Sequence, residues 1–137
     1  QKKNWMKQMP LQQALQLDSL NLKFLVLQGE GLMNKPKYNL SFLPIFQEDL
    51  YEVTDYITNA LKNPSAAHRL LDDIEFAISK RLEMPLSFPK YQSSKLRKQV
   101  YYRINVRNFS IFYVVIGNTM EVRRLLYAKK NIDELLK

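Results

Sequence analysis

The sequence contains no cysteine and a single histidine, His68, among its 137 residues. Without thiols the chain forms no disulfide, no zinc ribbon and no cysteine nucleophile, which fits the reducing cytoplasm. One histidine argues against a histidine-based metal site and against a Ser–His triad, so we expect no metal and no cofactor. His68 lies off the apolar side of its predicted helix, and we interpret it as a surface residue.

Long apolar runs are also absent. No stretch approaches the roughly 20 apolar residues that a membrane-spanning helix needs. The amino end lacks the basic, apolar and small-residue order of a secretory signal. With only 3 glycines and 6 prolines, and with 46% hydrophobic residues, the chain has the material for a packed core. We therefore expect a cytoplasmic protein of one folded domain that does not associate with a membrane.

Acidic and basic residues are unevenly distributed along the chain. Residues 86–130 hold ten lysines and arginines against one acid, Glu121, whereas residues 45–83 hold eight acids against four basic residues. The acidic half has helical spacing and the basic half has strand alternation. Since the net charge is +8, we expect a sheet with a basic outer or concave face. Such a face attracts nucleic acid or an acidic protein partner.

The acidic half is predicted to be a short strand followed by a helical hairpin. Alternation predicts the strand over residues 38–42. The first helix begins at Pro44, and its apolar stripe is Phe46, Leu50, Val53, Ile57 and Leu61. The second begins at Pro64 after an Asn63 cap, and its stripe is Ala67, Leu71, Ile74, Ile78 and Leu82. The link between the helices is short, which favours an antiparallel pair.

From residue 99 the apolar period changes to two, which indicates strands. The predicted core face of the first strand is Val100, Tyr102, Ile104 and Val106, and its other face is Tyr101, Arg103, Asn105 and Arg107. A tight turn is expected at 107–108, with Asn108 suited to a left-handed backbone. Residues 109–116 are apolar on both faces, which is typical of a central strand.

The last predicted strand covers residues 120–127. Its alternation slips at Arg123 and Arg124, which predicts a bulge. Asn131 and Glu134 form a capping pair for a final helical turn. The predicted fold class is α+β with the order β-α-α-β-β-β-α, in which the helical hairpin packs on a small antiparallel sheet.

Over residues 38–136 the sequence resembles the RelE/ParE superfamily of bacterial toxins from type II toxin–antitoxin modules. The matching stretches, in order, are Asn63-Pro64-Ser65-Ala66-Ala67, Phe88-Pro89, Tyr102-Arg103-Ile104-Asn105-Val106, residues 108–115 (NFSIFYVV) and residues 124–130 (RLLYAKK). The resemblance implies a small sheet packed on a helical hairpin. It also implies neutralisation by a cognate antitoxin that wraps the toxin in a hetero-oligomer.

The superfamily contains two activities. RelE-like members cut mRNA on the ribosome, whereas ParE-like members poison DNA gyrase and are not nucleases. RNA cleavage needs a base, cations and an acid, which RelE-like toxins supply from Lys, Arg and Tyr. When the functional positions of RelE-like toxins are carried over to this sequence by strand position, Arg103 and Lys130 keep the positive charge. Asn105, Ser110 and Leu136 stand where the RelE-like pattern has a Lys, an Arg and a Tyr.

These departures favour a ParE-like toxin that inhibits DNA gyrase. A RelE-like ribosome-dependent mRNA endoribonuclease is the alternative, so whether the protein is an enzyme stays open. A non-toxic basic binding module is a further alternative, because fold alone does not fix function.

Four basic residues lie on or at the ends of the three consecutive strands, and we expect them to carry the activity: Arg103, Arg107, Arg124 and Lys130. Each is expected to engage a phosphate or a partner carboxylate. The wider set of candidate target-binding residues adds Lys95, Arg97, Lys98, Tyr101, Arg123 and Lys129. Tyr101 fits base stacking or, as a strand tyrosine, simple packing.

Residues 1–32 differ in composition from the rest, being rich in Gln and Leu. Gln28-Gly29-Glu30-Gly31 can be encoded by a purine run of the kind that precedes a bacterial start codon, so we expect a toxin domain over 33–137 that starts at Met33. Residues 1–32 are then a leader or an upstream extension. If the leader is ordered, we expect it on the surface that an antitoxin covers, with residues 22–28 adding to a sheet edge. The alternative is a disordered extension.

Overall fold

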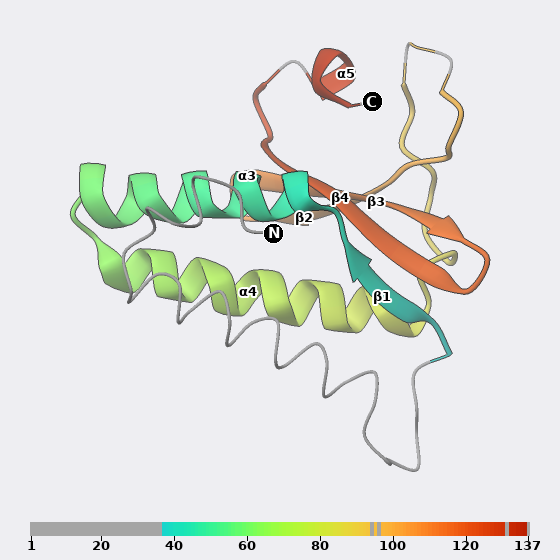
Figure 1. The fold of residues 1–137 in the computed structure, drawn as a ribbon, viewed down its shortest axis with the longest axis horizontal. Coiled ribbons are helices and arrows are strands. Elements are labelled where there is room, and N and C mark those ends of the chain that lie inside the picture. The colour runs from blue at the N-terminus through green and yellow to red at the C-terminus, as the bar shows by residue number, and fades with distance from the viewer. Residues whose placement is uncertain (1–36, 94, 96, 131, 137) are drawn as a thin grey trace.

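The structure is a computed structural model that describes residues 37–93, 95, 97–130 and 132–136. The expectations for residues 1–32, including the start at Met33, lie outside the described residues, as does the proposed cap Asn131. Within the described part, one mixed sheet separates two layers (Figure 1). Two long helices cover one face of the sheet, and a short helix with the loop before the second strand covers the other.

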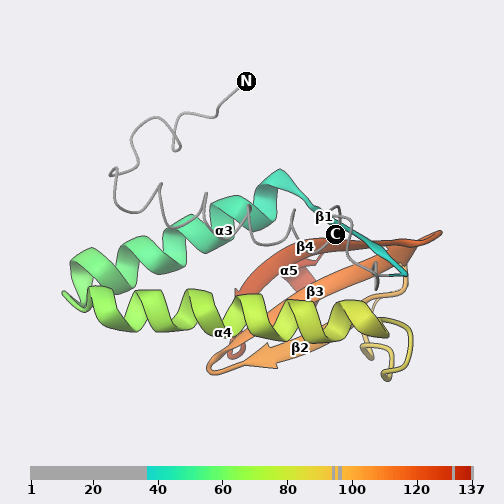
Figure 2. The same ribbon diagram turned by 90° about the horizontal axis from the view of Figure 1, so that it is seen from below.

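The elements follow the predicted order. They are β1 (Asn39–Phe42), α3 (Pro44–Asp55), the π-helix η1 (Tyr56–Ala60), α4 (Pro64–Glu83), β2 (Tyr102–Val106), β3 (Phe109–Ile116), β4 (Thr119–Tyr127) and α5 (Ile132–Leu135). α3 and α4 lie side by side and are joined at one end, which confirms the hairpin (Figure 2). The predicted α+β class is confirmed.

The strand order is β1-β4-β3-β2. The β2–β3 and β3–β4 pairs are antiparallel as expected, but β1 runs parallel to β4 from Asn39 opposite Thr119 to Phe42 opposite Val122. The sheet is therefore mixed, because alternation along a strand carries no information about its direction. β1 is only four residues long, so β4 has no neighbouring strand on that side beyond Val122 among the described residues.

The main core lies between the helical hairpin and the sheet. Its fully buried side chains include Phe46, Ile74, Ile78, Ile111, Tyr113, Met120 and Val122. The stripe of α4 is buried as predicted. The predicted stripe of the first helix is not buried at its last residue, Leu61, which is 55% exposed. The π-turn bond from the Leu61 N–H to the Tyr56 carbonyl adds a residue to the turn and rotates Leu61 away from the core.

Several local predictions are confirmed. The Asn63 side chain accepts a hydrogen bond from the Ala66 N–H at 3.1 Å and caps α4. The bulge in β4 is also present, since Phe112 pairs with Arg124 and Tyr113 pairs with Val122. Arg123 is the extra residue between them. The bulge places two consecutive arginines outside the main core, between the core residues Val122 and Leu125.

Two predictions for the hairpin strands are wrong. Val100 is exposed, because regular pairing in β2 starts only at Tyr102. The left-handed residue of the β2–β3 turn is Arg107, with φ of 55°, and not Asn108. The Asn108 carbonyl accepts a hydrogen bond from the Ala128 N–H, which holds that residue in the β3–β4 ladder and leaves the turn conformation to Arg107.

Tyr113 ties the sheet to the end of α4. Its hydroxyl donates to the Pro85 carbonyl at 2.7 Å and accepts from Arg81 Nη1 at 3.0 Å. Burial is the largest cause that raises the pKa of Tyr113 above its usual value, while Arg81 partly offsets the rise.

This shift predicts a loss of stability in alkali. The phenol has an ordinary pKa of about 10 in the unfolded chain, so its contribution is complete below that pH and is lost as the pH rises towards the higher folded value. We expect the free energy of unfolding to fall more steeply above about pH 10 in the wild type than in Tyr113→Phe. Urea denaturation at a series of alkaline pH values measures both slopes, and equal slopes would contradict the assignment.

Candidate functional site

Arg124 is held at the unpaired edge of β4. Its Nε donates to Asp49 Oδ2 at 2.8 Å, its Nη2 donates to Asp49 Oδ1 at 3.1 Å, and its Nη1 donates to the Leu135 carbonyl at 2.9 Å. Asp49 also accepts the Leu125 N–H at 3.0 Å, where a further strand would bond. The hydrogen bond to Asp49 is the largest cause that raises the pKa of Arg124. This arginine is a structural link between α3, β4 and α5.

The side chains of Arg97 and Arg123 also form hydrogen bonds within the protein. Arg97 donates to the carbonyls of Leu136 and Asp133 at 2.7 and 2.8 Å and to Ser93 Oγ at 3.0 Å. It therefore fixes the loop before β2 to α5. Arg123 donates through Nε to Glu121 at 2.7 Å.

Tyr101 is not an exposed contact residue, since only 3% of it is accessible. It belongs to a second apolar cluster beneath α5, made of Tyr101, Phe112, Val114, Leu126, Ile132 and Leu136. Its hydroxyl accepts from Arg123 Nη1 at 3.2 Å. The sequence pattern placed Tyr101 on the outer face correctly, but it did not reveal that α5 covers that face.

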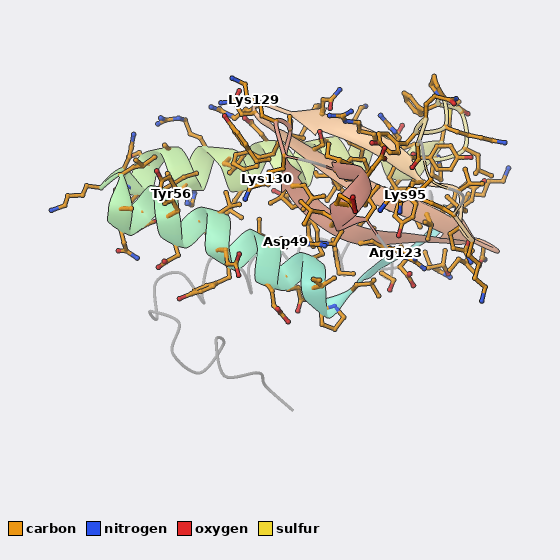
Figure 3. The ribbon with its side chains drawn as sticks, turned by 90° about the horizontal axis from the view of Figure 1, so that it is seen from above. Asp49, Tyr56, Lys95, Arg123, Lys129 and Lys130 are labelled. Carbon is orange, nitrogen blue, oxygen red and sulfur yellow. The ribbon has the colours of Figure 1, made fainter. Side chains whose placement is uncertain are left out.

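The other candidate cations lie at the surface in separate places. Arg107 pairs with Asp73 of α4, and Lys95 pairs with Glu134 of α5. Lys98, Lys129 and Lys130 are exposed and form no ion pair with another described residue. Figure 3 shows Lys129 and Lys130 at one end of the sheet and Lys95 towards the other. These exposed lysines therefore lie towards different ends of the sheet.

Arg103 differs from these arginines. Its Nε donates to Ser110 Oγ at 2.9 Å, and the Ser110 hydroxyl donates to Asn105 Oδ1 at 3.1 Å. Its guanidinium carbon lies 5.7 Å from the centre of the Phe112 ring and 5.9 Å from that of Tyr91. Neither terminal nitrogen of Arg103 has a hydrogen-bond partner among the described residues.

Arg103, Asn105, Ser110, Phe112 and Tyr91 are here called the Arg103 cluster. This cluster can bind an anion, but it contains no group suited to accept a proton. A guanidinium stays protonated at neutral pH, and the Ser110 hydroxyl and Asn105 amide are not bases. Burial is the largest cause that raises the pKa of Tyr91, and its hydrogen bond to Asp133 raises it further. Lys130, the other cation retained from the RelE pattern, follows β4, two strands away from Arg103 on β2.

A groove of about 700 Å³ runs along the free edge of β4 between α3, η1 and α5. Its apolar lining comes from Val53, Ile57, Phe109, Leu125, Leu126 and Leu135. Tyr56 and Tyr127 stand exposed beside it, with Glu52 and Lys130. The sequence did not predict this groove, because it exists only where β1 stops short and where η1 widens the end of α3.

No helix in the described part of the chain is long and apolar enough to cross a membrane. The same residues contain no group of three or more acidic or histidine side chains arranged to hold a metal ion.

Comparison with known proteins identifies the family. The family model described as ParE toxin of the type II toxin–antitoxin system parDE matches residues 40–132. The chain belongs to the ParE toxin family. This confirms the resemblance found in the sequence, and the match includes the whole Arg103 cluster and the sheet edge that forms the groove.

Solved structures similar to this ParE family member come from toxin–antitoxin systems. The chromosomal ParDE system of P. aeruginosa contains a chain with a TM-score of 0.57 and 14% identity, covering 69% of this chain and 100% of that one. The RelB–RelE antitoxin–toxin complex of Methanococcus jannaschii contains a chain with a TM-score of 0.40 and 27% identity, covering 70% and 99%. The first likeness shows the shared fold. A search of the curated proteins found no match.

Proposed function

We propose that this ParE family member is a growth-inhibiting toxin that binds and inhibits DNA gyrase and does not cleave mRNA. The observation that carries the proposal is the Arg103 cluster. Attack by a 2′-hydroxyl on a phosphate requires a residue that takes its proton and another that protonates the leaving oxygen. The side chains that hold Arg103 are Ser110 and Asn105, which position a cation and transfer no proton at neutral pH.

We further propose that a cognate antitoxin covers the groove beside β4 and forms a hetero-oligomer with the toxin. The family is defined by a two-component system, and the groove offers an apolar surface with two exposed tyrosines. Glu52 and Lys130 at its rim make no ion pair with a described residue, so each can pair with a charge on the partner. Exposed apolar grooves with a polar rim are typical protein-binding surfaces.

Induced expression without an antitoxin tests the function. We expect growth arrest with an SOS response, and we expect the purified protein to inhibit gyrase supercoiling. Rapid cleavage of mRNA at codons with arrested translation would instead support the RelE-like alternative. Normal growth would refute both and leave the non-toxic binding module. Parallel expression of the full chain and of residues 33–137 also tests whether the leader moderates toxicity.

A further inference from the structure

We propose that Arg103 is a preorganised two-pronged binding site for a single carboxylate of a protein partner. The inference deepens the proposed function and rests on it only for the identity of that partner. Its ligand is an aspartate or glutamate side chain, or a chain terminus, presented on a protein surface.

The hydrogen bonds of Arg103 leave one mode of recognition available. Nε is taken by Ser110, so a bidentate ligand must approach the two terminal nitrogens end-on. Ser110 is fully buried in the middle strand, and its hydroxyl is fixed in turn by Asn105. The guanidinium plane is therefore oriented before any partner arrives, which reduces the entropy lost on binding.

Two aromatic rings support the same orientation. Phe112 and Tyr91 both lie within 6 Å of the guanidinium carbon of Arg103, and they pack edge-to-face with their centres 5.2 Å apart. Tyr91 is itself held by its hydrogen bond to Asp133 at 3.1 Å. Such rings favour a cation over their faces and exclude water from one side of it, which strengthens an ion pair formed on the other.

The surrounding charge fits one carboxylate better than a nucleic acid. Arg97, Arg123 and Arg124 are each paired with an acid, at 3.5 Å to Asp133, 2.7 Å to Glu121 and 2.8 Å to Asp49. A phosphate chain is bound by a succession of unpaired cations. These three arginines are therefore not free to bind successive phosphates, whereas a planar carboxylate matches the Arg103 fork with two parallel hydrogen bonds.

Charge-conserving variants test the site. The full chain is titrated with a short synthetic peptide that carries glutamates, and with its glutamine counterpart, while NMR follows the Arg103 side-chain resonances. We expect the glutamate peptide alone to shift them. Arg103→Lys keeps the charge and loses the fork, so the dissociation constant should rise about ten-fold. Ser110→Ala should weaken binding several-fold, and Arg69→Lys, exposed on α4 at the opposite face of the sheet, should bind as the wild type does.

Equal binding by wild type and Arg103→Lys would overturn the proposal, as would unshifted Arg103 resonances in the presence of the glutamate peptide. A single-stranded oligoribonucleotide that shifts these resonances and binds more tightly than the peptide would assign the site to nucleic acid. No gyrase is present in the titration. A protein that passes it but does not inhibit gyrase therefore refutes only the proposed function, and an inhibitor that fails it refutes only the carboxylate site.

Discussion

Replacing Asp49 by alanine is expected to lower the free energy of unfolding by about 3–5 kcal/mol. The substitution leaves the Arg124 guanidinium, whose side chain is 17% exposed, without its carboxylate. It also removes the acceptor of the Leu125 N–H at the edge of β4. An uncompensated charge and an unpaired amide in a partly buried place are both strongly destabilising.

Urea denaturation at neutral pH measures this effect, and Asp73→Ala is the matched control. The Arg107–Asp73 pair also joins a helix to a strand end, but its side chains are 50% and 45% exposed. Exposed pairs contribute at most about 1 kcal/mol. Similar losses in the two variants would show that the edge position of Asp49 has no special importance.

The second large effect is expected for Arg97→Ala, which should release α5 from the outer face of the sheet. The Arg97 side chain is only 11% exposed and supplies charged donors to the carbonyls of Asp133 and Leu136. Hydrogen bonds from charged groups contribute about 1.5–3 kcal/mol each. α5 is a single turn that packs through Ile132 and Leu136, and the Arg97 hydrogen bonds add to this packing in holding it on the sheet.

Hydrogen exchange at the Leu136 amide, which bonds to the Ile132 carbonyl, reports this release directly. We expect exchange to be faster by about a hundred-fold, the equivalent of about 2.8 kcal/mol. Lys95→Ala is the control, because the exposed Lys95–Glu134 pair joins the same loop to the same helix. If both variants exchange alike, Arg97 does not hold α5.

The elements that sequence patterns predicted well are those set by local chemistry. The Asn63 cap, the proline at the start of each long helix, the stripe of α4 and the slip of phase in β4 each depend on residues within a few positions of one another. The predicted burial of Leu61 after α3 was wrong, because a π-turn changes the helical period and no residue type at 56–60 signals such a turn.

The functional site was less predictable for a physical reason. The fate of each arginine depends on an acid that is remote in sequence, as with Arg124 and Asp49, which are 75 residues apart. The same basic stretch therefore contains residues that tie helices to the sheet and residues that remain accessible. The distribution of charge along the sequence predicted one basic face, because it gives the number of charged residues and does not show which of them are paired.

The sequence by itself determined the α+β class, the order of the elements, the family and the common face of Arg103 and Asn105, because alternation fixes which residues share a side of a sheet. Only the tertiary structure decided that β1 stops short and leaves a groove beside β4, and that Asp49 closes part of that edge. The tertiary structure was also needed to show that the terminal nitrogens of Arg103 have no partner among the described residues. Strand direction, edge exposure and charge pairing depend on contacts between distant segments, which local patterns do not encode.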